Sequence, residues 1–282
     1  MTDPTPTNDA TSPPYTAAFN EFQVAIRRST ISRTFIVAGM RRSGNHAIIN
    51  WLANALEGTA TEFRYVTTGV IGISTSGRTA HANDLTLDPY SDYFDLAVDH
   101  LRLFSAADSL ILSFEDWTIN GHFERLLDAS STVRRVYVQR STLNTLASRL
   151  QALKQNEHLG QTNSGLEITQ EMLDAMLSNR AALPAGWTVI DFDRWLTEGA
   201  PFRRAILCDL DLDVDIEPPI STVAQGSSFT FRERVPTSAE LTSRLTSIIW
   251  PEDLVELLLR PRNFDLLTAD EVEFLLNAPP NT

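Results

Sequence analysis

The segment Gly39–His46 (GMRRSGNH) has the G-x-x-x-x-G spacing of a phosphate-binding loop. Two glycines, Gly39 and Gly44, allow the backbone to curl so that successive N–H groups face inward, and a helix that follows adds partial positive charge. The pattern therefore predicts an anion site, with a nucleotide phosphate as its natural ligand. A loop of the NTPase kind continues with Lys and then Ser or Thr, which bind the terminal phosphates and magnesium. Asn45 and His46 occupy those places, so the loop can hold phosphate but lacks the hydroxyl that would bind the metal.

The segments on either side of this loop suit a strand and a helix. Residues 33–40 are a short apolar run, typical of a strand buried on both faces. In residues 46–58 apolar side chains recur at helical spacing, and Gly58 supplies the stop. Further buried strands are expected at 109–115, 135–140 and 187–192, and further helices at 143–153 and 171–182.

Strands that alternate with helices predict an α/β fold with right-handed crossovers. We expect three layers, α/β/α, around a central and mostly parallel sheet, with the phosphate-binding loop after the first strand. Ligands of such sheets bind beyond the carboxyl ends of the strands. The residues that follow each predicted strand are therefore the candidates for function.

The composition, with 43% apolar and 21% charged residues in 282, is that of a globular protein. We expect a disordered tail over residues 1–16, which are rich in Thr, Pro and Asp, and a single domain over 17–282. Within that domain, residues 59–108 are expected to form a substrate-binding excursion, and residues 236–282 are expected to form C-terminal helices. The sequence shows neither a membrane-spanning apolar stretch nor a secretory signal, so a cytoplasmic location is expected.

The net charge of −13 argues against nucleic acid and anionic membranes as partners, because both need a broad basic face. Any small anionic ligand must therefore be bound by a local group of cations. Lys154 is the only lysine among the 23 basic residues, and the others are arginines. Chemistry that usually relies on lysine must rely on arginine in this chain. The single cysteine, Cys208, excludes an internal disulfide and a cysteine-rich zinc site.

The stretch VAGMRRSGNHAIINWL is similar to the 5′-phosphosulfate-binding loop of sulfotransferases that use 3′-phosphoadenosine 5′-phosphosulfate (PAPS). The resemblance implies that the donor is held by the loop residues Arg41, Arg42, Ser43, Gly44, Asn45 and His46. Arg42 then falls on the position of the family's catalytic lysine. An arginine can stabilise charge on the leaving oxygen by donating hydrogen bonds, but its pKa is too high for ready proton donation.

A second stretch, VRRVYVQRSTLNTLAS, resembles the 3′-phosphate element of the same family, in which a strand ends in Arg and a Ser follows in the next helix. The corresponding residues are Arg140 and Ser148. An arginine at a strand end can make a bidentate contact with phosphate, while the helix brings a hydroxyl from about two turns further on. A kinase that uses ordinary ATP has no 3′-phosphate and needs no such pair.

Two weaker similarities extend the resemblance over most of residues 33–235. The stretches WTVIDFDRWL and FRRAILCDLDL resemble a strand, acidic turn and helix of the family. Residues 225–229, followed by Arg232, resemble its late nucleotide-binding loop. The resemblance implies that Gly226, Ser227 and Ser228 contact the 3′-phosphate.

Sulfonate transfer to a hydroxyl also needs a base for the acceptor proton. Glu115, at the end of a predicted strand, is the first candidate. The alternatives are Asp116, His81, His100 and His122. No metal site is predicted.

Glu115 and Asp116 also allow a second interpretation of the sequence. They end the stretch LILSFED, which resembles an apolar strand followed by the acidic magnesium ligand of a phosphate-loop kinase or NTPase. A third interpretation is a catalytically silent nucleotide-binding protein.

The resemblance thus implies a sulfotransferase with adenosine 3′,5′-bisphosphate (PAP) as its nucleotide product. By family analogy, the acceptor hydroxyl is expected on a glycan or glycolipid. The aromatic residues Tyr90, Tyr93, Phe94 and Trp117 are candidates for lining its site, although aromatic residues also serve as core. The apolar run over residues 245–264 fits either the core or a homodimer interface.

Overall fold

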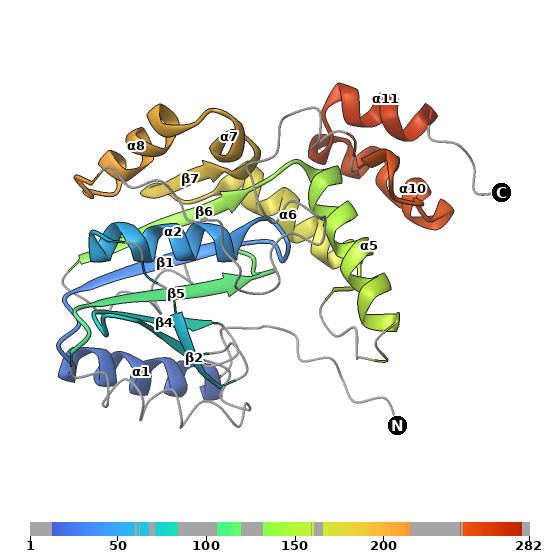
Figure 1. The fold of residues 1–282 in the computed structure, drawn as a ribbon. Helices are drawn as coiled ribbons and strands as arrows, with labels where there is room; N and C mark the ends of the chain where they lie inside the picture. Colours follow the sequence, from blue (N-terminus) through green and yellow to red (C-terminus); the bar gives the residue numbers. More distant parts are fainter. Residues whose placement is uncertain are drawn as a thin grey trace.

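The structure of the chain is a computed structural model that describes residues 13–59, 61, 63–67, 71–83, 106–119, 132–158, 160, 166–214, 243 and 245–277. Within these residues, seven strands form one sheet in the order β2-β3-β4-β5-β1-β6-β7 (Figure 1). The strands are β1 (Arg33–Gly39), β2 (Phe63–Thr67), β3 (Ile71–Ser74), β4 (Thr79–Asn83), β5 (Ser109–Glu115), β6 (Thr132–Gln139) and β7 (Trp187–Asp191).

The sheet is mostly parallel, as the sequence predicts. Strands β4, β5, β1, β6 and β7 run parallel, whereas β2 pairs antiparallel with β3 and β3 pairs antiparallel with β4. The register places Gly39 opposite Glu115 on one side and opposite Val138 on the other. The carboxyl ends of the three central strands therefore meet at one edge of the sheet.

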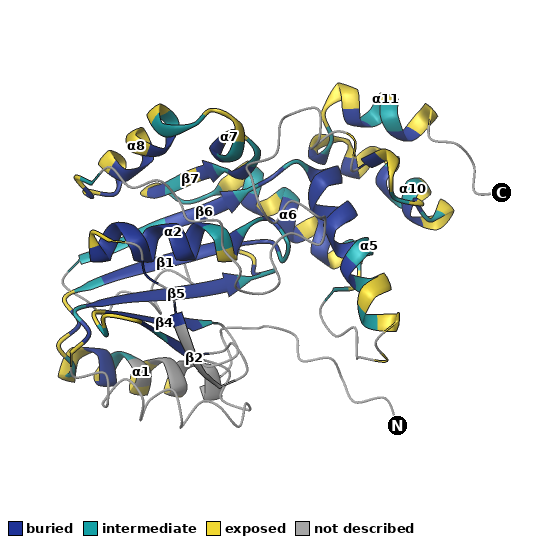
Figure 2. Ribbon diagram, in the orientation of Figure 1, coloured by how far each residue is buried: buried dark blue, intermediate teal, exposed yellow. Residues whose placement is uncertain are grey.

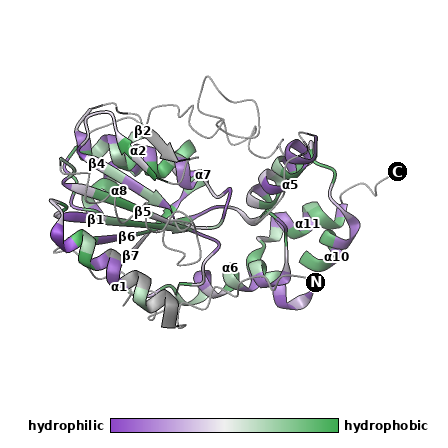
Figure 3. Cartoon of the chain, turned by 90° about the horizontal axis from the view of Figure 1, so that it is seen from below, coloured by the Kyte–Doolittle hydropathy of each residue, from purple (hydrophilic) through white to green (hydrophobic). Residues whose placement is uncertain are grey.

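Helices cover both faces of this sheet. The described helices are α1 (Pro13–Arg28), α2 (Asn45–Glu57), α5 (Thr142–His158), α6 (Gln170–Ala182), α7 (Phe192–Thr197), α8 (Ala200–Asp209), α10 (Glu252–Leu258), the 3-10 helix η3 (Pro261–Leu266) and α11 (Ala269–Asn277). Phe35 and Val37 of β1 pack with α2, α7 and α8, whereas Ile36 and Ala38 pack with α1 on the opposite face. This alternation, which follows from the two-residue period of a strand, gives the three predicted layers. Figure 2 shows the central strands buried between them, and Figure 3 shows hydrophobic residues concentrated in the strands between α2 and α1.

A third apolar cluster joins the C-terminal helices to the middle of the chain. Leu254 and Leu258 of α10 and Leu275 of α11 share this cluster with residues of α5 and α6 and with Met40, which directly follows β1 (Figure 1). These leucines of the C-terminal region therefore belong to a core that reaches the predicted loop. None of the helices in the described part of the chain combines the length and hydrophobicity needed to cross a membrane.

Several element boundaries differ from the sequence-based expectations. Helix α1 begins at Pro13, so residues 13–16, predicted as part of the disordered tail, are helical, and residues 1–12 lie outside the described residues. Within the expected excursion 59–108, the described residues form β2, β3 and β4, which extend the sheet. These strands are short and are separated by Gly, Ser and Thr, so their pattern resembles turns. Residues 84–105 of this segment lie outside the described residues.

Candidate functional site

The carboxyl ends of four parallel strands bring four short segments together. These segments are loop 39–46 after β1, Glu115 and Asp116 after β5, Arg140 after β6, and Asp193 in the first turn of α7 after β7. All of them lie at the edge where ligands of parallel α/β sheets bind. The site is therefore built from segments that are far apart in the sequence.

Loop 39–46 has a backbone that turns sharply before α2 begins. Arg42 has φ 72° and Gly44, the N-cap of α2, has φ 107°, both in the left-handed region. Because Gly44 has no side chain, the first turn of α2 begins without an N-cap side chain from that position. The first N–H groups of a helix have no partner within the helix and carry partial positive charge. The loop thus has the backbone form of an anion site.

The packing around Gly39 and Gly44 also explains why these positions are glycines. A Cβ atom at Gly44 would lie 2.4 Å from the ring of Phe192. At Gly39 it would lie 2.4 Å from Oδ1 of Asn45 and 2.8 Å from the carbonyl oxygen of Val138. The two glycines therefore allow the loop to lie directly against β6 and α7.

Gly44→Ala is expected to lower the free energy of unfolding by about 2 kcal/mol, because the alanine would be strained in its backbone and would overlap Phe192. Gly58→Ala is a matched control at the other end of α2. Gly58 also has a positive φ, 69°, but its Cβ would meet nothing within 4 Å among the described residues. Urea unfolding of both variants measures the difference, and equal losses would show that Phe192 does not restrict position 44.

Two side chains of the loop point into the loop itself. The Ser43 hydroxyl donates to Oδ1 of Asn45 at 3.0 Å, and both residues are almost fully buried. Nδ2 of Asn45 donates to Oε1 of Glu115 at 3.0 Å and to the carbonyl oxygen of Met40 at 3.3 Å. These side chains hold the loop in shape, so binding of an anion here would rest on backbone N–H groups and on Arg42. His46, in the first turn of α2, is exposed.

Arg42 connects the loop to α5. Its Nε donates to the Ser148 hydroxyl at 3.1 Å, so two of the predicted donor-binding residues are in direct contact. Burial lowers the pKa of the Arg42 guanidinium; the nearby Glu115 carboxylate opposes this shift, and Arg140 and Arg149 add to it. The guanidinium is thus held among other charges in a partly dry environment, where its interaction with an anion is strengthened.

Arg140 faces the same loop. Its Nη1 donates to the carbonyl oxygen of Arg42 at 3.2 Å, and its Nε donates to Oδ1 of Asp193 at 3.2 Å. The guanidinium lies over the Phe192 ring at 5.4 Å, and only 5% of the side chain is exposed. These two contacts use one N–H of Nε and one of Nη1 among the five N–H donors of the guanidinium.

Two carboxylates at the end of β5 both face the loop. Oε2 of Glu115 lies 3.5 Å from Nε of Arg41, and 21% of the Glu115 side chain is exposed. Oδ1 of Asp116 accepts the backbone N–H of Arg41 at 2.8 Å and also contacts Nη2 of Arg149. The Arg41 guanidinium therefore lies beside carboxylates.

Sequence reasoning missed Arg149 and Asp193. Arg149 directly follows Ser148 in the sequence. Asp193 lies just after a predicted strand, and this position at the edge of the sheet could have indicated that Asp193 belongs to the site. Arg149 joins Arg41, Arg42 and Arg140 in a group of four guanidiniums. Asp193 joins Glu115 and Asp116 as the three carboxylates beside them. Among these seven side chains of the described residues, the four guanidiniums exceed the three carboxylates by one positive charge, in a protein of net charge −13. An anion can therefore be bound here despite the overall charge.

Of the three histidines considered as the base, the structure describes only His81. His81 lies in β4 with 1% of its surface exposed, and its Nε2 is 2.9 Å from the Ser113 hydroxyl. Burial, together with the nearby His46, lowers the pKa of His81 to about 3. An imidazole this buried cannot meet an acceptor hydroxyl, so we do not retain it as a base. His100, His122, Gly226, Ser227 and Ser228 lie outside the described residues.

Comparison with known proteins finds a similarity in structure. No family model matches the sequence, and no curated protein matches it. Among solved structures, the chain is similar to the crystal structure of mouse sulfotransferase SULT7A1 complexed with PAP, with 13% sequence identity and a TM-score of 0.41. The match covers 70% of this chain and 65% of the mouse protein.

Proposed function

We propose that this chain transfers a sulfonate group from PAPS to a hydroxyl of an acceptor and releases PAP. The observation that carries the proposal is the meeting of two predicted anchors at Arg42. Its Nε donates to Ser148 and its carbonyl oxygen accepts from Arg140. A donor with phosphate groups on both its 5′ and 3′ sides needs two cationic groups within reach of one ligand, and this arrangement supplies them.

The proposed chemistry assigns one task to each group. The acceptor oxygen forms a bond to sulfur while the bond from sulfur to the 5′-phosphate oxygen breaks. Arg42 and the N-terminus of α2 stabilise the negative charge that develops on the leaving phosphate. Arg140 and Ser148 bind the 3′-phosphate.

Glu115 is the proposed base, which takes the proton of the acceptor hydroxyl. The side chains of Glu115 and Asp116 are exposed to a similar degree, 21% and 22%, so their contacts distinguish them. Asp116 accepts the Arg41 N–H and contacts the buried guanidinium of Arg149, whereas Glu115 accepts from the neutral Nδ2 of Asn45 and lies 3.5 Å from Nε of Arg41. A general base must come within hydrogen-bond distance of the proton that it takes, and we assign this task to Glu115 because Asp116 is the more tightly held of the two.

The contacts of the two carboxylates argue against the kinase or NTPase alternative. A magnesium ligand in that class would follow the apolar strand β5, where Glu115 and Asp116 lie. Asn45 donates to Glu115 and Arg149 contacts Asp116, so both carboxylates already pair with protein donors.

The proposed acceptor is a hydroxyl compound, and a glycan or glycolipid is the class that the sequence resemblance favours. Trp117 does not support an aromatic acceptor site, because it is buried and packs edge-on against Phe114 at 5.7 Å. Its indole belongs to the core. Tyr90, Tyr93 and Phe94 lie outside the described residues.

Thermal shift with PAP, ADP and ATP tests the donor. PAP is expected to raise the Tm more than ADP or ATP at equal concentration, because only PAP carries a 3′-phosphate for Arg140, and a ligand at about 100 times its Kd stabilises by about 2.7 kcal/mol. Addition of EDTA should leave the PAP shift unchanged. A larger shift with ATP that depends on magnesium would overturn the proposal in favour of a kinase or NTPase. Binding of PAP without turnover of PAPS with any hydroxyl acceptor would instead indicate a silent binding protein.

A further inference from the structure

Asp116 and Arg149 together hold one residue of loop 39–46 by both of its backbone polar groups. Oδ1 of Asp116 accepts the Arg41 N–H at 2.8 Å, and Nε of Arg149 donates to the Arg41 carbonyl oxygen at 3.2 Å. Nη2 of Arg149 also contacts Oδ1 of Asp116, which closes the ring of contacts. We call these three residues the Arg41 clamp.

The burial of Arg149 indicates that the clamp is more than a surface ion pair. Its side chain is 1% exposed, whereas exposed ion pairs contribute little to stability. A buried guanidinium is costly unless its donors meet acceptors, and the acceptors of Arg149 include Asp116, the Arg41 carbonyl and the Glu167 carbonyl at 3.4 Å. The contacts of Asp116 and Arg149 therefore hold the backbone of the loop at Arg41.

The clamp fixes two successive peptide planes. In a planar trans peptide, the carbonyl of one residue and the N–H of the next point in opposite directions. When Arg149 holds the Arg41 carbonyl, the Arg42 N–H is therefore directed away from Arg149. When Asp116 holds the Arg41 N–H, the Met40 carbonyl is directed the other way, where it accepts from the Ser43 N–H at 3.0 Å and from Asn45.

The backbone around the clamp also needs external support. Asp116 and Arg42 have φ values of 64° and 72°, and the left-handed region is unfavourable for residues other than glycine. The N–H of Asp116 donates to the Gly39 carbonyl at 3.1 Å, which ties this turn to the end of β1. Of the two residues with positive φ, Asp116 belongs to the Arg41 clamp and Arg42 directly follows Arg41.

We infer that Asp116 and Arg149 are positioning residues that preorganise loop 39–46 for the 5′ anionic group of the donor. This inference rests on the proposed function. A loop that is already held in its binding conformation loses less free energy on ordering when the ligand binds. Asp116 then acts on the loop backbone, whereas Glu115 acts on the acceptor.

Two measurements on Asp116→Ala test the inference. Hydrogen exchange of the Arg41 amide in the ligand-free protein should become faster, and the Kd for PAP should rise about tenfold through loss of a charged hydrogen bond. Asp116→Asn keeps an oxygen acceptor and should restore most of the amide protection. Arg149→Met should also weaken PAP binding, and the double variant should lose less than the sum of the single losses because the two residues share one contact.

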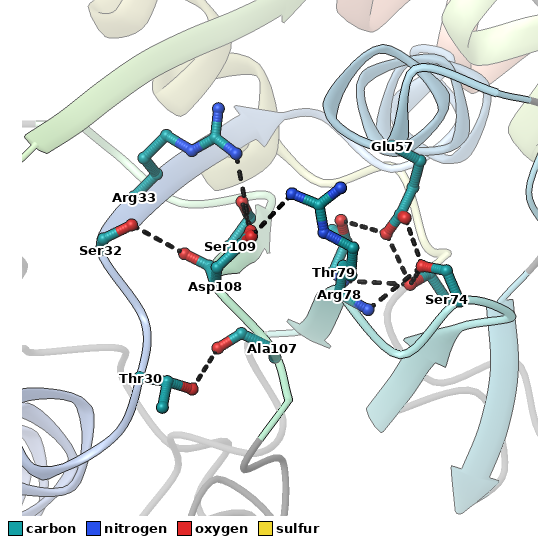
Figure 4. Close-up of polar contacts among 11 residues, drawn as sticks. Thr30, Ser32, Arg33, Glu57, Ser74, Arg78, Thr79, Ala107, Asp108 and Ser109 are labelled. Atoms are coloured by element: carbon teal, nitrogen blue, oxygen red, sulfur yellow. Dashed lines mark hydrogen bonds and ion pairs between the residues drawn. The ribbon is translucent and has the colours of Figure 1, made fainter.

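Asp108→Ala is the matched control. Asp108 precedes β5 as Asp116 follows it, and it pairs with Arg78 at 2.9 Å and with Arg33 at 3.5 Å (Figure 4). Its loss should leave the Kd for PAP and the Arg41 amide unchanged.

Three results would contradict the proposal in different ways. Unchanged exchange of the Arg41 amide in Asp116→Ala would show that Asp116 does not hold the loop. A rise in Kd no larger than that of Asp108→Ala would show that the clamp has no positioning role. If the wild-type protein does not bind PAP at all, the proposed function is wrong and the donor role of the clamp is wrong with it, while the exchange comparison still reports whether the clamp exists.

Discussion

Arg140→Ala is expected to raise the Kd for PAP by about thirtyfold or more, which corresponds to the roughly 2 kcal/mol of a charged contact with phosphate. The guanidinium is almost fully buried and is already held toward the loop by Asp193 and by the Arg42 carbonyl. Because those protein contacts fix its orientation before a ligand arrives, little of its binding free energy is lost in ordering the side chain. Isothermal titration with PAP measures the change.

The comparison of PAP with AMP makes this test specific for the 3′-phosphate. AMP lacks that group, so its affinity should fall much less than that of PAP in Arg140→Ala. Arg134→Ala is the control in the same strand, since Arg134 pairs with Asp211 near the surface and away from the loop. An equal loss of affinity for both nucleotides would mean that Arg140 acts only by supporting the Arg42 carbonyl.

Removal of Arg140 also has a cost in stability that must be separated from binding. Its loss leaves the buried side of Asp193 without its cation and uncovers the face of Phe192. Arg140→Lys keeps the charge but cannot reproduce the two-sided contact of a guanidinium. We therefore expect the lysine variant to be more stable than Arg140→Ala while it still binds PAP more weakly than the wild type.

Glu115→Gln is expected to lower turnover of PAPS by about 10² to 10⁴ while the Kd for PAP changes little. Glutamine keeps the side-chain oxygen that accepts from Nδ2 of Asn45, so the contact with the loop can persist. It cannot take the acceptor proton, which is the step that Glu115 is proposed to perform. Single-turnover measurements at saturating PAPS separate this effect from donor binding.

Glu57→Gln provides a carboxylate control at the far end of α2. Glu57 is buried and accepts from the hydroxyls of Ser74 and Thr79, both at 2.7 Å (Figure 4). Its replacement should affect stability but not the rate of transfer. A greater loss of transfer rate in Asp116→Asn than in Glu115→Gln would identify Asp116, and not Glu115, as the base. Asp116 would then have a catalytic role in addition to its role in the Arg41 clamp.

The C-terminal region shows how distant segments support the Arg140 anchor. Oε1 of Glu271, in α11, accepts from the Ser141 hydroxyl at 2.6 Å and from the Leu143 N–H at 2.9 Å, and Oε2 accepts from the Thr268 N–H at 2.9 Å. One carboxylate thus caps both α5 and α11, where it meets the positive ends of two helices. This contact fixes the start of α5 immediately after Arg140.

Local patterns were sufficient to predict the framework of this site. Short continuous apolar runs predicted β1, β5 and β7 as strands buried on both faces. Helical spacing of apolar residues predicted α2 and α5, and a helix was also predicted where α6 lies. The glycines at 39 and 44 predicted the turn between β1 and α2. The parallel sheet then required the residues after each strand to meet at one edge.

Only the tertiary structure decided which charged groups meet. The sequence shows neither that Arg42 contacts Ser148, nor that Asp116 and Arg149 hold Arg41, nor that Asp193 orients Arg140. Short strands such as β2 to β4 were also missed, since their stability comes from pairing with neighbours and not from local pattern. Hydrophobic period is a property of adjacent residues, whereas the pairing of charges depends on distances set by packing, and those distances exist only once the chain has folded.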